Sequence, residues 1–157
     1  MEELYMEKVF EDFFSELQAD MVSICLEYVE ERAEKIYIYC SFESRVIAND
    51  FFYKINGKIV KKHKLNDVLV KGQKEYDVSV IRQKSVLKII NDNIMALIKL
   101  CQEYQREMPT QIKLVYDITT GKLNADYSYD LVYSNDETRT ADDVLEEWYH
   151  LEKSEEE

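Results

Sequence analysis

The stretch Gln111–Tyr133, QIKLVYDITTGKLNADYSYDLVY, decides the fold that the sequence predicts. Apolar residues alternate with polar or smaller ones on both sides of the central segment Thr119–Lys122. Alternation on either side of a glycine-containing turn indicates two antiparallel strands, each with one buried face. Gly121 can adopt the positive φ that such turns require. A sheet with an apolar face must be covered, so the hairpin also predicts helices packed on it.

Three helices are predicted outside this hairpin. Apolar residues at three- and four-residue spacing predict a long helix from residue 2 to about residue 31 and a second over Asp77–Tyr104. Thr140 followed by acidic residues is typical of an N-cap, with Asp143 completing a capping box, and predicts a short helix over Ala141–Lys153. The tail 154–157 is expected to be frayed.

The remaining strands are predicted between the first two helices. Lys35–Glu43 is apolar on both faces, which indicates a central strand. Arg45–Ile55 and Lys58–Leu65 follow, joined by Asn56-Gly57, the strongest two-residue hairpin signal. The sequence therefore predicts one α+β domain over residues 1–157: an antiparallel sheet of about five strands packed against a long N-terminal helix, a long central helix and a short C-terminal helix.

Charge is distributed unevenly along the chain. The 157 residues carry 32 acidic and 20 basic side chains, a net charge of −12. Residues 1–34 hold 11 acids and 2 bases, and residues 124–157 hold 12 acids and 2 bases, whereas residues 54–74 hold seven lysines and one acid. The acidic balance disfavours binding to nucleic acid or to an anionic membrane and suits a basic protein partner. The lysines are typical of a protected sheet edge.

The cysteines and the hydropathy indicate a cytoplasmic protein. Cys25, Cys40 and Cys101 are isolated and each lies among apolar residues, so we expect them to be buried in a reducing compartment. The N-terminal MEELYMEK is acidic where a signal peptide would be basic. No apolar run approaches the ~20 residues of a membrane span.

No motif of catalysis or of cofactor or metal binding is found. Three scattered glycines make no phosphate-binding loop, and His63 and His150 lie far apart in the sequence. We therefore predict no enzyme activity, no cofactor and no metal. Asp126 and Asp130 are expected to point the same way from one strand, so they could bind a hard cation or act as acid and base. Exposed polar alternation on a half-buried strand is a far commoner reason for two such residues.

One segment resembles a known family. The stretch YDITTGKLNADYSYD (116–130), followed by a short acidic segment and a C-terminal helix with Glu146-Glu147-Trp148, resembles the YezG-like antitoxin or immunity protein family of bacteria. The resemblance covers most of the chain loosely, residues 110–150 best and residues 56–80 least. It implies an immunity protein that binds and neutralises a cognate secreted toxin, such as a nuclease, by stoichiometric occlusion through an acidic surface, with the C-terminal toxic domain of the toxin as the partner.

Charge and predicted exposure, rather than a family motif, suggest the residues that would contact such a partner. Exposed acids near the C-terminus would meet a basic toxin surface, and a tyrosine could anchor it. Trp148 is expected to dock the last helix instead. The predicted partner-binding residues are Asp126, Asp130, Tyr133, Asp136, Glu137, Asp142, Asp143, Glu146, Glu147 and Tyr149.

Two other classes of function stay open at this point. A small-ligand protein or enzyme would use a polar pocket between the sheet and the long helix. An adaptor or homodimer would bring the basic region 54–74 of one copy against the acidic C-terminal region of another. The sequence is thus compatible with a monomer or a weak homodimer.

Overall fold

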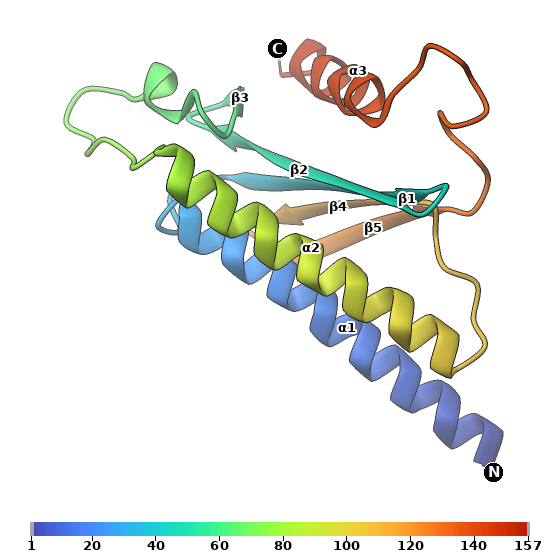
Figure 1. Ribbon diagram of the computed structural model, residues 1–157. Coiled ribbons are helices and arrows are strands. Elements are labelled where there is room, and N and C mark those ends of the chain that lie inside the picture. The colour runs from blue at the N-terminus through green and yellow to red at the C-terminus, as the bar shows by residue number, and fades with distance from the viewer. Residues whose placement is uncertain (1, 157) are drawn as a thin grey trace.

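The computed structural model describes the backbone of residues 2–156 and the side chains of residues 9–156. Five strands form one antiparallel sheet in the order β3-β2-β1-β4-β5, with three α-helices packed on it (Figure 1). This arrangement confirms the predicted α+β fold. The elements in chain order are α1 (Glu2–Tyr28), β1 (Lys35–Glu43), β2 (Val46–Ile55), β3 (Lys58–Lys61), the 3₁₀ turn η1 (Leu65–Val68), α2 (Val80–Glu103), β4 (Gln111–Asp117), β5 (Lys122–Ser128) and α3 (Ala141–Ser154).

Strand β1 lies at the centre of the sheet and pairs antiparallel with β2 and β4. Its side chains alternate between two apolar layers. Ile36 and Ile38 pack in the layer of α1 and α2, whereas Tyr37 and Tyr39 pack in the layer of α3. Figure 1 shows the resulting order of layers, with the α1–α2 pair on one side of the sheet and α3 on the other. The central position predicted for this strand is confirmed.

Helices α1 and α2 run side by side across one face of the sheet and enclose the main core with it (Figure 1). The buried side chain of Asn93, on α2, makes a polar contact with the exposed Asp20 of α1. The Nδ2 group of Asn93 donates to Oδ2 of Asp20 at 2.7 Å and to the carbonyl oxygen of Ile89 at 2.9 Å. Because a buried amide left unpaired is costly, this contact favours one alignment of the two helices.

Both long helices are shorter than predicted, and local backbone geometry explains why. Helix α1 ends at Tyr28, and Glu30 takes a positive φ of 55°, which is incompatible with a continuing right-handed helix. Helix α2 begins at Val80 because Ser79 is its N-cap: the hydroxyl of Ser79 accepts a hydrogen bond from the backbone N–H of Arg82.

The β2–β3 hairpin forms at the predicted turn, but its second strand is short. Asn56 and Gly57 both have positive φ, 52° and 78°, as this turn type requires. Strand β3 ends at Lys61, although the sequence predicted a strand as far as Leu65. The chain turns there because the Leu65 side chain is fully buried in the main core through the 3₁₀ turn.

Strand β5 also ends earlier than its alternating pattern suggested. It stops at Ser128 because its partner strand β4 begins only at Gln111, two residues after Pro109. The Thr110 hydroxyl donates to the carbonyl oxygens of Ser128 at 3.1 Å and Asp130 at 2.6 Å, which turns the chain away from the sheet. Asp130 therefore lies outside the strand, and the prediction that it shares a strand face with Asp126 is wrong.

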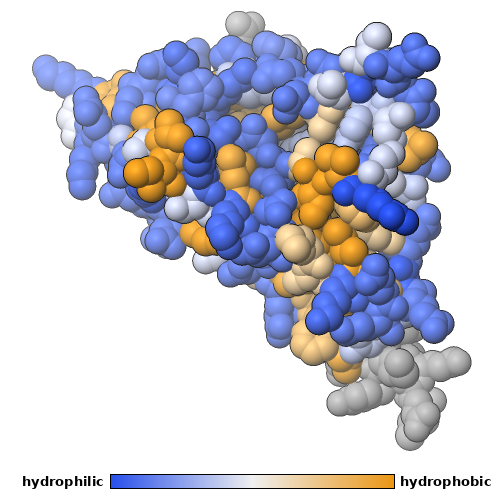
Figure 2. All heavy atoms as spheres, viewed as in Figure 1, coloured by the Kyte–Doolittle hydropathy of each residue, from blue (hydrophilic) through white to orange (hydrophobic). Residues whose placement is uncertain are grey.

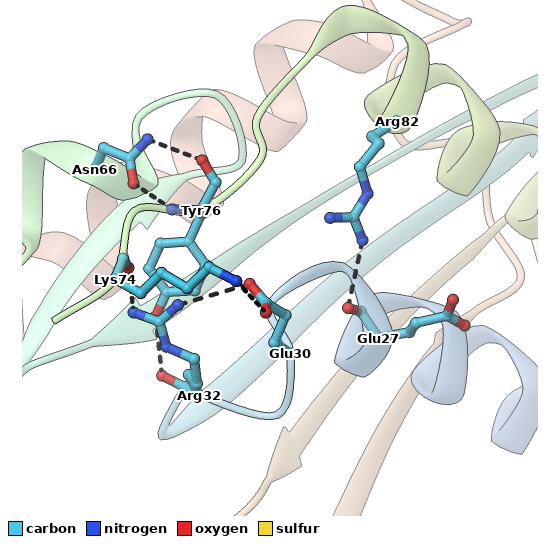
Figure 3. A network of polar contacts seen from close by, with 7 residues as sticks. All are labelled: Glu27, Glu30, Arg32, Asn66, Lys74, Tyr76 and Arg82. Atoms are coloured by element: carbon cyan, nitrogen blue, oxygen red, sulfur yellow. Dashed lines mark hydrogen bonds and ion pairs between the residues drawn. The ribbon is translucent and has the colours of Figure 1, made fainter.

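A network of polar contacts fixes the irregular segment between β3 and α2 (Figure 3). The guanidinium of Arg32 lies 4.0 Å from the ring centroid of Tyr76 and donates to the carbonyl oxygen of Lys74 at 2.5 Å. The side chain of Asn66 accepts from the backbone N–H of Tyr76 at 2.7 Å and donates to its carbonyl oxygen at 3.1 Å. This lysine-containing segment is thereby attached to the loop between α1 and β1.

The packing of the second apolar layer predicts that two residues of α3 differ sharply in their contribution to the free energy of unfolding. Trp148 is 6% exposed and packs edge-on against the rings of Tyr37 and Phe52, whereas Leu151 is 56% exposed. Replacing Trp148 with Ala should lower the free energy of unfolding by about 3–5 kcal/mol, because it leaves a cavity. Leu151→Ala should cost no more than about 1 kcal/mol. Urea denaturation followed by circular dichroism measures both, and equal losses would contradict this packing.

Candidate partner-binding surface

The carboxylate of Glu43 anchors the acidic C-terminal region to the sheet. It lies at the end of β1, where Glu43 is only 3% exposed. Its oxygens accept hydrogen bonds from the backbone N–H groups of Val132 (2.9 Å), Tyr133 (3.4 Å) and Ser134 (3.0 Å) and from the Ser134 hydroxyl (2.7 Å). Burial alone raises the pKa of this carboxyl group, but the hydrogen bonds outweigh burial and the pKa lies below its ordinary value.

A second contact holds the same segment. The hydroxyl of Ser41, on β1, donates to the hydroxyl oxygen of Tyr133 at 2.9 Å. The side chain of Tyr133 is half-buried as a result, so it lies partly against the sheet. Sequence reasoning missed Glu43, although an acid at the end of a central strand that is apolar on both faces is a signal that such an anchor exists.

Two local motifs then shape the start of α3. One carboxylate oxygen of Asp136 accepts from the backbone N–H of Thr138 at 2.9 Å and from its hydroxyl at 3.1 Å, and these bonds lower the pKa of Asp136. The predicted capping box is confirmed: Asp143 accepts from the backbone N–H of Thr140 at 2.9 Å, and the Thr140 hydroxyl accepts from the Asp143 N–H at 3.3 Å. The acidic side chains thus stand on a fixed backbone.

An open groove of about 800 Å³ lies between this loop and α3. It carries four carboxylates and one guanidinium, and the ion pair between Arg139 and Glu147 spans it. The lining residues are Asp136, Thr138, Arg139, Asp143, Glu146, Glu147, His150 and Leu151. Figure 2 shows that hydrophilic side chains dominate the visible surface over α3, whereas hydrophobic side chains gather in patches along the α1–α2 pair. The groove is therefore an acidic surface suited to contact with a large partner.

The structure brings together four of the ten residues predicted to bind a partner. Asp136, Asp143, Glu146 and Glu147 all line the groove. Glu137 lies beside it in an adjoining hollow, and Asp142 is exposed in the first turn of α3. Asp126 and Asp130 are exposed but lie on and after β5, outside the groove.

The exposure predicted for Tyr149 is wrong. Its side chain is 9% exposed, and its ring packs edge-on against Phe52 with centroids 5.3 Å apart. The Tyr149 hydroxyl donates to the carbonyl oxygen of Ile59 at 3.4 Å. Helix α3 is rotated so that Tyr149, rather than Leu151, completes its buried stripe. Tyr149 stabilises the α3 layer and does not offer an exposed aromatic anchor.

Part of the basic region is paired with acids of the same chain. The ammonium of Lys61 lies 2.7 Å from Glu146 of α3, and that of Lys62 lies 2.8 Å from Asp50. These four residues line a small pocket of about 120 Å³ between β2, β3 and α3. Its charges neutralise one another in pairs, so it offers no uncompensated charge to a small ligand.

The three cysteine thiols lie in surroundings that disfavour their reactive form. Cys25, Cys40 and Cys101 are free and buried, as predicted. Burial raises the pKa of all three thiols, that of Cys40 to about 12, so the reactive thiolate is disfavoured. Within residues 9–156 no group of three or more His, Cys, Asp or Glu side chains is arranged to hold a metal ion.

No family model matches the chain, and no curated protein is significantly similar to it. Among residues 2–156, none of the helices combines the length and apolar character needed to cross a membrane. The description of the acidic groove therefore rests on the structure of this chain alone.

The Glu43 anchor predicts a pH-dependent contribution to stability. Glu43→Gln should lower the free energy of unfolding by about 2–3 kcal/mol at neutral pH, because it replaces a charged acceptor of four donors. The folded-state pKa of Glu43 is lowered, so its contribution is complete above the unfolded pKa of about 4.3 and is lost as pH falls through the folded pKa. The difference between wild type and variant should therefore shrink below about pH 4.

Urea titrations at pH 7 and at acid pH measure this difference. Glu107→Gln, at an exposed position, is the matched control and should change stability little at either pH. A difference between wild type and Glu43→Gln that stays constant with pH would argue against an ionised anchor.

Proposed function

We propose that this protein is an immunity protein of the YezG-like kind, which neutralises a toxin by covering a basic surface of it. The observation that carries the proposal is the acidic groove, which holds three carboxylates of the capped helix α3 and that of Asp136 from the loop before it. The resemblance of residues 116–130 and of the EEW segment to this family supplies the class of partner.

The charge and rigidity of the surface support this function. A toxin that acts on nucleic acid needs basic side chains to hold phosphates, and these side chains are complementary to an acidic groove. The net charge of −12 adds long-range attraction toward such a partner, which speeds encounter. Because the Glu43 anchor and the capping box fix the backbone, little conformational entropy is lost on binding.

In this proposal inhibition is stoichiometric and needs no turnover. One copy of the protein occupies the toxin and blocks access of its substrate. The contact residues are the exposed acids Asp136, Glu137, Asp142, Asp143 and Glu147. Glu146 contributes less, because it is half-buried and Lys61 compensates its charge, and the ion pair with Arg139 partly offsets the charge of Glu147. The protein would act in the cytoplasm of the cell that makes the toxin, with no role for a cofactor.

The test begins with the partner. The protein is used as bait in a lysate of its own cells, and the captured protein is then expressed with and without it. We expect the captured protein to arrest growth alone and to be harmless when this protein is co-expressed. A captured protein without toxicity contradicts the proposal.

Charge reversal then locates the contact. A triple variant, Glu137→Lys, Asp142→Lys and Glu147→Lys, should weaken binding at least about tenfold, mainly by slowing association, and should abolish protection. The matched control reverses three exposed acids on the other side of the sheet, Asp12, Glu103 and Glu107, and so changes the net charge equally. Surface plasmon resonance and growth assays measure both. Equal loss in the two variants would show that net charge, and not the groove, matters.

A further inference from the structure

The two edge strands of the sheet differ in whether their outer backbone groups are covered. Strand β3 is only four residues long, and side chains of the C-terminal region cover its outer backbone groups. The carboxylate of Glu156 accepts from the N–H of Ile59 at 2.7 Å, and Tyr149 and Lys153 donate to the Ile59 carbonyl oxygen at 3.4 Å. A further strand cannot pair with this edge, which is the usual protection against association.

Among the side chains of residues 9–156, none is hydrogen-bonded to the outer backbone groups of β5, the strand at the opposite edge. It runs for seven residues, Lys122–Ser128, with neither proline nor glycine, and residues 122–127 are all exposed. Leu123 is 37% exposed along it, and Tyr127, whose ring packs against Phe14 of α1 and whose hydroxyl accepts from Gln18, is still 36% exposed. A long, regular and partly apolar edge is a ready template for another strand.

The hydrogen-bond pattern between β1, β4 and β5 shows which backbone groups of β5 such a strand would meet. The N–H of Ile118 donates to the carbonyl oxygen of Glu34, so the even-numbered residues of β4 pair with β1 and the odd-numbered ones pair with β5. In the β4–β5 register, the odd-numbered residues of β4 lie opposite Lys122, Asn124, Asp126 and Ser128 of β5, so these four residues use their N–H and carbonyl groups to pair with β4. The N–H and carbonyl groups of Leu123, Ala125 and Tyr127 therefore point outward.

We propose that β5 pairs with β5 of a second copy of this chain, antiparallel and centred on Ala125, to form one continuous ten-stranded sheet. In this register the outward groups of Leu123, Ala125 and Tyr127 meet those of Tyr127, Ala125 and Leu123 of the second copy. All seven residues of the strand take part. The two-fold symmetry is the commonest one for soluble oligomers.

The side chains of β5 are complementary to themselves in this register. Leu123 lies opposite Tyr127 twice, and the small Ala125 lies at the two-fold axis, where close approach is needed. No like charges lie directly opposite each other, and Lys122 is diagonal to Asp126 of the second copy, within reach of its long side chain. This self-complementarity favours a second copy over an unrelated strand.

The dimer is independent of the proposed toxin contact. It uses Asp126 but leaves the groove of α3 free, so each copy could still bind a partner. It also differs from a dimer between the basic region and the acidic C-terminal region. Because both copies carry −12, added salt should favour the β5 dimer by screening repulsion, whereas it should weaken a dimer built on opposite charges.

Cross-linking tests the register. Ala125→Cys places two thiols at the axis in a hydrogen-bonded pair with Cα atoms about 5.5 Å apart, which suits a disulfide. Mild oxidation should therefore give a covalent dimer, while Ala96→Cys, at an exposed position on α2, should not. The native cysteines are buried and do not interfere. Absence of the dimer, or equal cross-linking of both variants, overturns the proposal.

Sedimentation equilibrium tests the association itself. The wild type should show twice the 18.7 kDa mass of the chain as its concentration rises, with tighter association at higher salt. Ala125→Asp should raise the dissociation constant at least about 100-fold, because two carboxylates meet at the axis, and Ala96→Asp should leave it unchanged. A wild-type monomer at all concentrations, or a dimer that Ala125→Asp does not weaken, refutes the β5 pairing.

Discussion

The buried carboxylate of Glu43 is the contact on which the C-terminal third of the molecule depends. After β5 the chain leaves the sheet, and no strand pairing guides it further. Four hydrogen bonds to Glu43 return it to the end of β1 and carry it to the face opposite α1 and α2. Helix α3 then covers an apolar surface that would otherwise face solvent. A single ionised side chain thus connects the central strand to the acidic surface.

Helix α3 has two roles that rest on different faces. Its buried stripe, with Trp148 and Tyr149, completes the second core, and its other face presents the acids of the groove. The last turns of the same helix and the residues after it also cover the edge of β3 through Ile59. The acidic surface and the protection of the β3 edge therefore both follow from the docking of α3 on the sheet. The edge at β5, on the other side of the sheet, is open.

Much of the fold could be predicted because its signals are local. The alternation in Lys35–Glu43, the Asn56-Gly57 turn and the capping box at Thr140 each depend on residues close in sequence. Two predictions that were wrong concern the ends of strands, which depend on residues far away in the sequence. Strand β3 ends early because Leu65 enters a distant core, and β5 ends where its partner strand begins. Such limits are set by neighbours in space.

The sequence by itself determined the class of fold, the acidic balance of the C-terminal region and the burial of the cysteines, since periodicity and composition are sufficient for these. Only the tertiary structure decided which acids share a groove, that Tyr149 lies inside and Leu151 outside, and that one sheet edge is covered while the other is open. These depend on the rotation of α3 about its axis and on which elements meet across the sheet. Both follow from packing between residues far apart in the chain.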